Sequence, residues 1–396
     1  MSTRTIIRNG RVVLPSTILD NAEVVIENGV IVEVSDSAGP VSDDCEIVDA
    51  GGNYVAPGCI DLHTHGAGGA DFMDGTVEAY LTAARTHATH GTTLLYPTTL
   101  TCSDEVLFKS FDLYDDACRR NIEGAQFGGI HLEGPFFNPE KAGAQDPKFL
   151  CNPTPEHYNE ILSRTDKIVR WSAAPELPGS EEFGRVLRDR GILAAFGHTD
   201  ATFEECDKAF KEGFTHMNHF YSAMSSVVRR NAYRYAGAVE YGYYNDAVTV
   251  EIICDGIHVP SSLLHLVQKI KGIDSIALIT DSMRAAGMPE GPSVLGGLSD
   301  GQPVIVEDGV AKLMDRSAFA GSVATADRLI RTITRVGDAT LVDAMKMASL
   351  TPARIMGIAS RKGSIEKGKD ADIIIFDGDI DIKRTIIGGR TVYEKA

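Results

Sequence analysis

The middle of the chain alternates short apolar runs with longer amphipathic stretches. Stretches with helical spacing, for example 77–90, 181–190, 203–212 and 262–271, separate the apolar runs. Eight of the runs have the length of strands, and they cover residues 59–63, 93–97, 129–132, 169–174, 193–197, 215–220, 248–254 and 275–280. This alternation is typical of βα units around a parallel sheet, and eight strands close a barrel. We therefore predict an α/β fold whose main part is a (β/α)8 TIM barrel.

The two ends of the chain have a different pattern, in which short apolar runs are followed by turn residues. Asn9-Gly10 and Asn28-Gly29 lie in such positions, and an Asn-Gly pair between apolar runs predicts a hairpin. Residues 371–376 and 385–387 repeat the pattern near the C-terminus. Neither end is long enough for a stable sheet of its own. We expect both ends to build one small β-sandwich domain, of residues 1–54 and 362–396, beside a barrel domain of residues 55–361.

Between the eighth strand and the C-terminal strands, the pattern predicts a hairpin and two helices. The hairpin covers residues 303–313 and turns at Asp308-Gly309. The helices lie near 324–335 and 341–356.

Composition and charge narrow the range of partners. Of the 396 residues, 43% are apolar, which is enough for a large core. The net charge of -17 opposes nonspecific binding to nucleic acid or to an anionic membrane, so an anionic substrate needs a local basic patch. No apolar run approaches the ~20 residues of a membrane span, and the first ten residues do not resemble a signal peptide. We expect a cytoplasmic protein whose seven scattered cysteines are reduced and mostly fill the core.

Polar residues stand at the C-terminal ends of several predicted strands, where a barrel carries its active site. His63 and His65 alternate along the first strand and therefore point to the same side. Glu133, His198 and His219 end the third, fifth and sixth strands. Imidazoles and a carboxylate that converge from different strands suit zinc, iron or cobalt and suit magnesium poorly. These five residues together predict a metal site.

One further strand end predicts catalysis. Asp281 follows a continuous apolar strand, which would bury it at the barrel mouth. Metal-assisted hydrolysis needs a carboxylate that accepts the water proton and returns it to the leaving group. The alternative is a carboxylate that caps a helix or lies in a loop.

Five further histidines are expected to lie outside the metal site. His216 lies three residues before His219 and faces the opposite side of that strand, so we expect it to be packed or hydrogen-bonded. We expect His87, His90, His157 and His265, on helices or loops, to be surface residues.

Several segments resemble the amidohydrolase superfamily and, within it, the branch that deacetylates N-acetyl hexosamine phosphates. The segments are 56–74 (APGCIDLHTHGAGGADFMD), 131–147 (HLEGPFFNPEKAGAQDP), 197–202 (GHTDAT), 219–225 (HFYSAMS), 255–259 (DGIHV), 278–288 (LITDSMRAAGM), 318–322 (AFAGS) and 349–357 (SLTPARIMG). The resemblance implies that Glu133, His198 and His219 form the metal site common to the family, and that His63 and His65 permit a second ion. It implies one or two zinc or iron ions, with Asp281 as the catalytic aspartate and His258 near the reacting carbonyl.

The same resemblance indicates where a substrate would lie. Gln145, Ser222 and Ala223 stand where relatives contact the sugar and phosphate, although the residue types differ here from the usual pattern. Phe319, Ala320 and Gly321 belong to another matching segment. Arg229, Arg230 and Arg234 match a region that offers a basic residue to the sugar phosphate, often across a dimer interface. We expect a homodimer in which one of these arginines binds phosphate; the alternative is a solvated basic face.

The resemblance implies a metal-dependent deacetylase of amino-sugar catabolism. The expected reaction converts N-acetylglucosamine 6-phosphate into glucosamine 6-phosphate and acetate. One alternative is the galacto epimer or another N-acyl hexosamine phosphate. A remote alternative is a sugar-phosphate-binding protein without catalysis, which would require a missing ligand or a missing proton acceptor. Hydrolysis of a ring amide fits poorly, because no lysine stands near the end of strand three or four to bridge two metals.

Overall fold

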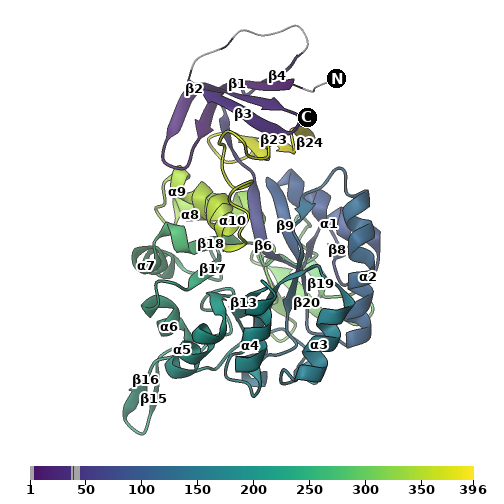
Figure 1. The fold of residues 1–396 in the computed structure, drawn as a ribbon, viewed down its shortest axis with the longest axis vertical. Helices are drawn as coiled ribbons and strands as arrows, with labels where there is room; N and C mark the ends of the chain where they lie inside the picture. Colours follow the sequence, from purple (N-terminus) through teal and green to yellow (C-terminus); the bar gives the residue numbers. More distant parts are fainter. Residues whose placement is uncertain (1–3, 37–38, 40–44) are drawn as a thin grey trace.

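The main body of the chain is a parallel eight-stranded barrel (Figure 1). The computed structural model describes residues 4–36, 39 and 45–396. The barrel strands are β6 (Cys59–Thr64), β9 (Thr92–Thr99), β11 (Ile130–Glu133), β12 (Ile168–Ala173), β13 (Leu193–Phe196), β14 (Phe214–Met217), β17 (Thr249–Ile253) and β18 (Ile276–Ile279). They pair in chain order, β6 to β9 and on to β18. All eight predicted strands are confirmed, and no end is shifted by more than three residues.

A helix follows each of the first seven barrel strands, as the amphipathic stretches predict. These helices are α1 (Val77–Thr89), α2 (Asp104–Arg120), α3 (Pro155–Arg164), α4 (Ser180–Asp189), α5 (Phe203–Glu212), α6 (Ala238–Tyr244) and α7 (Ser261–Lys271). Their apolar faces pack with the strands in one large core that includes Trp171, Phe183 and Phe214. A short strand, β10 (Gln126–Phe127), pairs with β9, and a small β7–β8 ribbon (Gly66–Ala67 and Ala70–Asp71) follows β6.

The barrel closes where its first and last strands meet. Asp281 donates its backbone N–H to the carbonyl of His63 at 2.9 Å, and His65 donates its own to the carbonyl of Ser282 at 2.8 Å. The buried Asp61 carboxylate accepts the hydroxyl of Thr280 at 2.5 Å. The bonds of this seam therefore lie beside the residues predicted to do chemistry.

Both ends of the chain contribute to one further sheet, which lies above the barrel in Figure 1. Its strand order is β24-β23-β22-β5-β1-β2-β3, and β4 pairs with β1. Ile7, Val24 and Ile373 are among the side chains of its separate apolar core. The strands are β1 (Arg4–Val13), β2 (Ile18–Glu27), β3 (Val30–Ser35), β4 (Cys45–Asp49), β5 (Tyr54–Pro57), β22 (Ile373–Phe376), β23 (Ile382–Ile387) and β24 (Arg390–Glu394). The small sandwich-like domain built from both ends is confirmed, whereas its limits at residues 54 and 362 stay a prediction.

One of the two predicted Asn-Gly hairpins is wrong. Asn28-Gly29 does turn between β2 and β3, but Asn9-Gly10 lies inside β1, where the pairing with β2 shifts between Ile7 and Gly10. Asn9 has a φ of 53°, so this pair forms a bulge. A Cβ on Gly10 would lie 2.5 Å from Val55, so the bulge needs glycine for close packing and β1 continues beyond it.

After the last barrel strand, the chain forms a small sheet and further helices. After β18, strands β19 (Gly291–Leu295), β20 (Gln302–Glu307) and β21 (Val310–Leu313) form a small sheet that contains the predicted hairpin. Helix α8 (Ala326–Arg335) follows, and the second predicted helix is divided into α9 (Leu341–Met345), a π-helical turn (Lys346–Leu350) and α10 (Thr351–Ile355).

Between β14 and α6, the hairpin of β15 (Val228–Arg230) and β16 (Tyr233–Tyr235) projects away from the barrel (Figure 1). Within the described ranges, no helix has both the length and the apolar character to span a membrane.

Candidate active site

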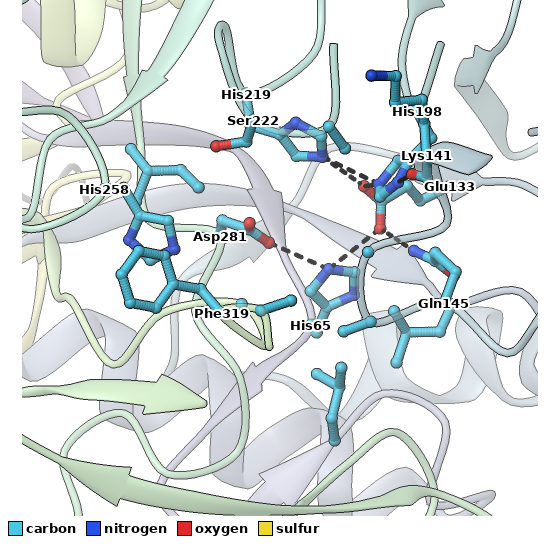
Figure 2. Close-up of a pocket in the computed structure, with 18 of the residues that line it drawn as sticks. His65, Glu133, Lys141, Gln145, His198, His219, Ser222, His258, Asp281 and Phe319 are labelled. Atoms are coloured by element: carbon cyan, nitrogen blue, oxygen red, sulfur yellow. Dashed lines mark hydrogen bonds and ion pairs between the residues drawn. The ribbon is translucent and has the colours of Figure 1, made fainter. Parts of the chain in front are cut away.

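Side chains at or just beyond the ends of β6, β11, β13, β14 and β18 come together at one end of the barrel. Figure 2 shows His65, Glu133, His198, His219 and Asp281 of this group. Glu133 is the last residue of β11, and its two carboxylate oxygens face different neighbours. Oε1 lies 3.0 Å from His219 Nε2 and 3.3 Å from His198 Nε2, whereas Oε2 lies 3.4 Å from His65 Nε2. Asp281 Oδ1 lies 3.2 Å from His65 Nε2 on the other side. The strand ends chosen from the sequence thus form one cluster.

The cluster contains two overlapping groups of donor atoms that could hold a metal ion. His63, His65 and Glu133 form one group, and Glu133, His198 and His219 form the other. Within each group the donor atoms lie within 4.8 Å of one another, and every member is buried. Two imidazoles and a carboxylate are a donor set that suits zinc or iron. These residues therefore fit a divalent transition metal, with Glu133 able to serve both positions.

The backbone at three of these positions is left-handed. His198, His219 and Asp281 each stand two residues beyond the end of a strand, with φ values of 45°, 20° and 47°. Such conformations are uncommon for residues other than glycine and cluster at functional sites. In this chain they accompany the convergence of all three side chains on one point.

Burial and charge act against each other in the cluster. Burial would raise the pKa of Glu133, but the imidazoles of His63, His198 and His219 hold it well below its usual value. Burial would likewise raise the pKa of Asp281, and His63 and His65 lower it. The same carboxylates raise the pKa of His63 well above its ordinary value despite the burial that opposes this. The carboxylates are therefore ionised, and their positive partners are protons on imidazoles or a bound cation.

A fully buried charged network lies beneath the cluster. Glu251 on β17 accepts from Arg170 Nη1 at 2.7 Å and from His216 Nε2 at 3.1 Å. Its other oxygen lies 3.0 Å from His63 Nδ1 and accepts the backbone N–H of His219 at 3.0 Å. Asn218 links Arg170 to the Glu133 carboxylate, with bonds of 2.6 and 3.0 Å. The prediction that His216 is a hydrogen-bonded structural residue is confirmed.

A pocket of about 370 Å³ opens above the cluster, a volume within the range of small-ligand sites. Its walls include His65, Glu133, His198, His219 and Asp281, together with the predicted Gln145, Ser222, Ala223, His258, Phe319 and Gly321. Ala320 is fully buried and is not among the lining residues. The Gln145 amide is already engaged, because Nε2 donates to Glu133 at 2.7 Å and Oε1 accepts from the Thr101 backbone at 2.8 Å. His258 Nδ1 lies 2.8 Å from Asp255, which leaves Nε2 as the ring atom for a substrate.

A sequence model of the amidohydrolase family matches residues 54–392. The chain belongs to the amidohydrolase family. It is 32% identical to N-acetylglucosamine-6-phosphate deacetylase of Lysinibacillus sphaericus, over 97% of each chain. It is 29% identical to N-acetylgalactosamine-6-phosphate deacetylase of Escherichia coli O157:H7, over 97% of this chain and 98% of the other. The structure is similar, with a TM-score of 0.89 and 27% identity, to a mutant N-acetyl-D-glucosamine-6-phosphate deacetylase of Mycobacterium smegmatis in complex with N-acetyl-D-glucosamine-6-phosphate; the match covers 98% of this chain and 99% of the other.

The three predicted phosphate-binding arginines do not join the site of their own chain. Arg229 and Arg230 lie on β15 and Arg234 on β16, all three are exposed, and none is among the lining residues of this amidohydrolase's pocket. The hairpin that carries them projects from the barrel (Figure 1). Sequence order placed them after the sixth strand, but it could not show that a hairpin carries them outward.

Sequence reasoning missed Lys141 and the buried Arg170–Glu251 network, and it misplaced His87. Lys141 lines the pocket with its side chain 3.3 Å from Asp200, and its carbonyl oxygen accepts from His198 Nδ1 at 2.8 Å. A cation in a segment already matched to the family, GPFFNPEKAGAQDP, was the available signal. His87 was expected at the surface, which is wrong: it is fully buried, with Nε2 3.0 Å from Thr64 Oγ1 and 3.2 Å from Ser282 Oγ. Burial in the barrel wall lowers its pKa to about 3.

Proposed function

We propose that this amidohydrolase removes the acetyl group from N-acetylglucosamine 6-phosphate and releases glucosamine 6-phosphate and acetate. The observation that carries the proposal is the convergence of both donor groups with Asp281 at a pocket, in a chain that resembles a deacetylase of this substrate over 97% of its length. The remote alternative, a binding protein without catalysis, loses support because both the donor groups and the proton acceptor are in place.

Different residues around the pocket would carry out different steps of the reaction. A divalent ion held by Glu133 and the histidines would polarise the acetyl carbonyl and activate water. Asp281, ionised at the pocket wall, would accept the proton of the attacking water and pass it to the departing amine nitrogen. His258, oriented through Nδ1 by Asp255, would hold the carbonyl oxygen with Nε2. Glu133, Asp281 and His258 line the same cavity, so one substrate could reach all of them.

For the cofactor, we propose zinc or iron, with one or two ions per subunit. The support is that Glu133 belongs to both donor groups, with Oε2 3.4 Å from His65 and Oε1 3.0 Å from His219 and 3.5 Å from His63. A carboxylate whose two oxygens both face imidazoles can bridge two ions or serve one. The His198–His219 group is the one we assign to the principal ion, because both histidines also line the pocket.

We propose a homodimer for phosphate recognition. Among the described residues that line the pocket, Lys141 is the one lysine or arginine, and its ammonium group faces Asp200. Three arginines stand together on the exposed β15–β16 hairpin. In a dimer, this hairpin could deliver an arginine to the pocket of the second copy. Arginine binds phosphate with two parallel hydrogen bonds, which suits it to this task.

A comparison of substrates tests the function. The metal-reconstituted enzyme would be assayed for acetate release from the gluco and the galacto 6-phosphates under steady-state conditions. We expect the gluco compound to give the higher kcat/KM. The similarity to the N-acetylgalactosamine-6-phosphate deacetylase supports the epimer as a second candidate, and a higher kcat/KM for it would select that alternative. Absence of acetate release from both, with metal bound, would refute the deacetylase proposal.

A further inference from the structure

A cysteine, a histidine and an aspartate form a chain of contacts outside the active site. Cys151 precedes α3, His157 lies in the first turn of α3, and Asp104 is the first residue of α2. Cys151 Sγ lies 3.7 Å from His157 Nδ1, and His157 Nε2 lies 3.0 Å from Asp104 Oδ1. The ring of the fully buried Phe136 packs edge-to-face on the imidazole with centroids 5.5 Å apart. The imidazole is thus fixed on three sides, and Cys151 is only partly buried.

This order of groups is the one that activates a nucleophile. A thiol is activated when a base stands within hydrogen-bond reach and a third group orients that base. Here the two ring nitrogens of His157 have different partners, sulfur at Nδ1 and carboxylate at Nε2. The contacts of Cys151 and Asp104 raise the pKa of His157 to about 9, so the ring carries a proton at neutral pH. An imidazolium beside a sulfur favours the thiolate, which is the reactive form.

The surroundings of five other cysteines differ from this. Burial raises the pKa of the thiols of Cys59, Cys206 and Cys254, and that of Cys102 to about 12. Cys118 is exposed, yet partial burial of its sulfur still raises the pKa of its thiol. Cys118 is therefore more accessible than Cys151 but lacks an imidazolium among the groups that shift it.

We propose that Cys151 is a covalent modification site for soft electrophiles, with His157 as the imidazolium that stabilises its thiolate and Asp104 as the residue that positions His157. The thiolate sulfur attacks the electrophilic carbon, the new S–C bond forms as the bond to the leaving group breaks, and His157 keeps its proton. With iodoacetamide the products are the carboxamidomethyl thioether and iodide. This site is separate from the deacetylase pocket, whose lining includes none of the three residues.

Labelling of the full-length, metal-loaded protein with a limiting amount of iodoacetamide at pH 7 tests the proposal. Peptide mass spectrometry would follow each cysteine. We expect Cys151 to be labelled at least about tenfold faster than Cys118, because His157 Nδ1 contacts the sulfur of Cys151.

Substitutions test the roles of His157 and Asp104. His157→Gln and Asp104→Asn should slow labelling at Cys151 by about tenfold and several-fold, respectively, and leave the rate at Cys118 unchanged. The matched control is His265→Gln, which removes a surface histidine whose Nε2 lies 3.2 Å from Asp338, and which should change neither rate. Thermal melting would verify that each variant is folded. Faster labelling at Cys118 or Cys45 than at Cys151, or an unchanged rate at Cys151 in folded His157→Gln, would overturn the proposal.

Discussion

The two sides of the donor cluster are built differently. His63 is fully buried, does not line the pocket, and is held through Nδ1 by Glu251 and Asn218 of the ionic network in the barrel core. His198 and His219 line the pocket and stand on left-handed backbone beyond their strands. His198 is held by a loop carbonyl, that of Lys141, and His219 Nδ1 is buried without a hydrogen-bond partner within the described residues.

The two sides therefore differ in what holds their histidines. Buried polar contacts to a ligand fix its ring orientation and its tautomer, so the His63 side has its geometry set before any ion binds. The His198–His219 side depends on a loop and on strained backbone, and it meets the substrate pocket. We therefore expect the two positions to respond differently to mutation, and the following experiments measure how differently.

The largest effect is expected at the residue that both sides share. Glu133→Gln should remove bound metal from both positions and abolish turnover, because it neutralises the one carboxylate common to the two donor groups. His63→Ala should leave one ion and partial activity. Metal analysis by mass spectrometry checks both variants; complete metal loss in His63→Ala would show that the two sides are not independent.

The next effect concerns chemistry without loss of metal. Asp281→Asn should retain the fold and the His198–His219 ion but lower kcat by about 10²–10⁴-fold, because an amide cannot accept the water proton. Steady-state acetate release and metal content are the measurements. A rate near that of the wild type, with metal retained, would remove Asp281 from the catalytic role.

The arginine hairpin lies outside both sides and should affect binding alone. Among Arg229→Ala, Arg230→Ala and Arg234→Ala, at least one should lower kcat/KM by about 10- to 150-fold for the phosphorylated sugar, from the loss of a charge-assisted hydrogen bond. The unphosphorylated N-acetyl sugar is the control, and its slow rate should barely change. Equal losses with both sugars would assign the residue to the fold or to catalysis.

A change in the network should act mainly on the His63 side, because Glu251 contacts the imidazole of His63 but only the backbone N–H of His219. Glu251→Gln should weaken metal binding at the His63 side by about 10- to 100-fold, as expected for a lost partner of a ligand histidine. It should also destabilise the fold by about 3–5 kcal/mol, because Arg170 stays buried without its ion partner. Metal titration and denaturant unfolding give both quantities. Weakened binding at the His198–His219 side to the same degree would contradict the division.

The last effect, on stability alone, is a pH dependence at His87, behind the His63 side. The folded pKa of His87, about 3, lies below its ordinary value of 6.5, so the unfolded chain takes up this proton first as the pH falls. The stability linked to His87 is therefore present above pH 6.5 and is lost toward pH 3, with a slope of up to about 1.4 kcal/mol per pH unit. His87→Gln should reduce the slope of the unfolding free energy against pH, measured between pH 6.5 and 4, by this amount. An unchanged slope would contradict the buried, neutral assignment.

Much of the fold could be predicted because the periodic pattern of apolar residues records burial. The barrel strands, most helices and the convergence of His63, Glu133 and Asp281 all follow from strand ends meeting at one edge. Contacts between distant segments could not be predicted in this way. The burial of His87 depends on Ser282 packing against its helix, and the Arg170–Glu251 pair joins strands that are not neighbours in sequence. Nor does the sequence show that Asn9-Gly10 forms a bulge, since the close packing at Gly10 involves Val55, which is distant in the sequence.

The contacts that close the barrel between β6 and β18 have a consequence for folding during protein synthesis. The first barrel strand carries His63 and His65, and the last is followed by Asp281, whose carbonyl accepts the backbone N–H of Ser322 at 2.7 Å. A nascent chain that ends before this point lacks both the closure of the barrel and the carboxylate proposed as the proton acceptor. The closure of the barrel and the delivery of Asp281 to the pocket are thus reached together.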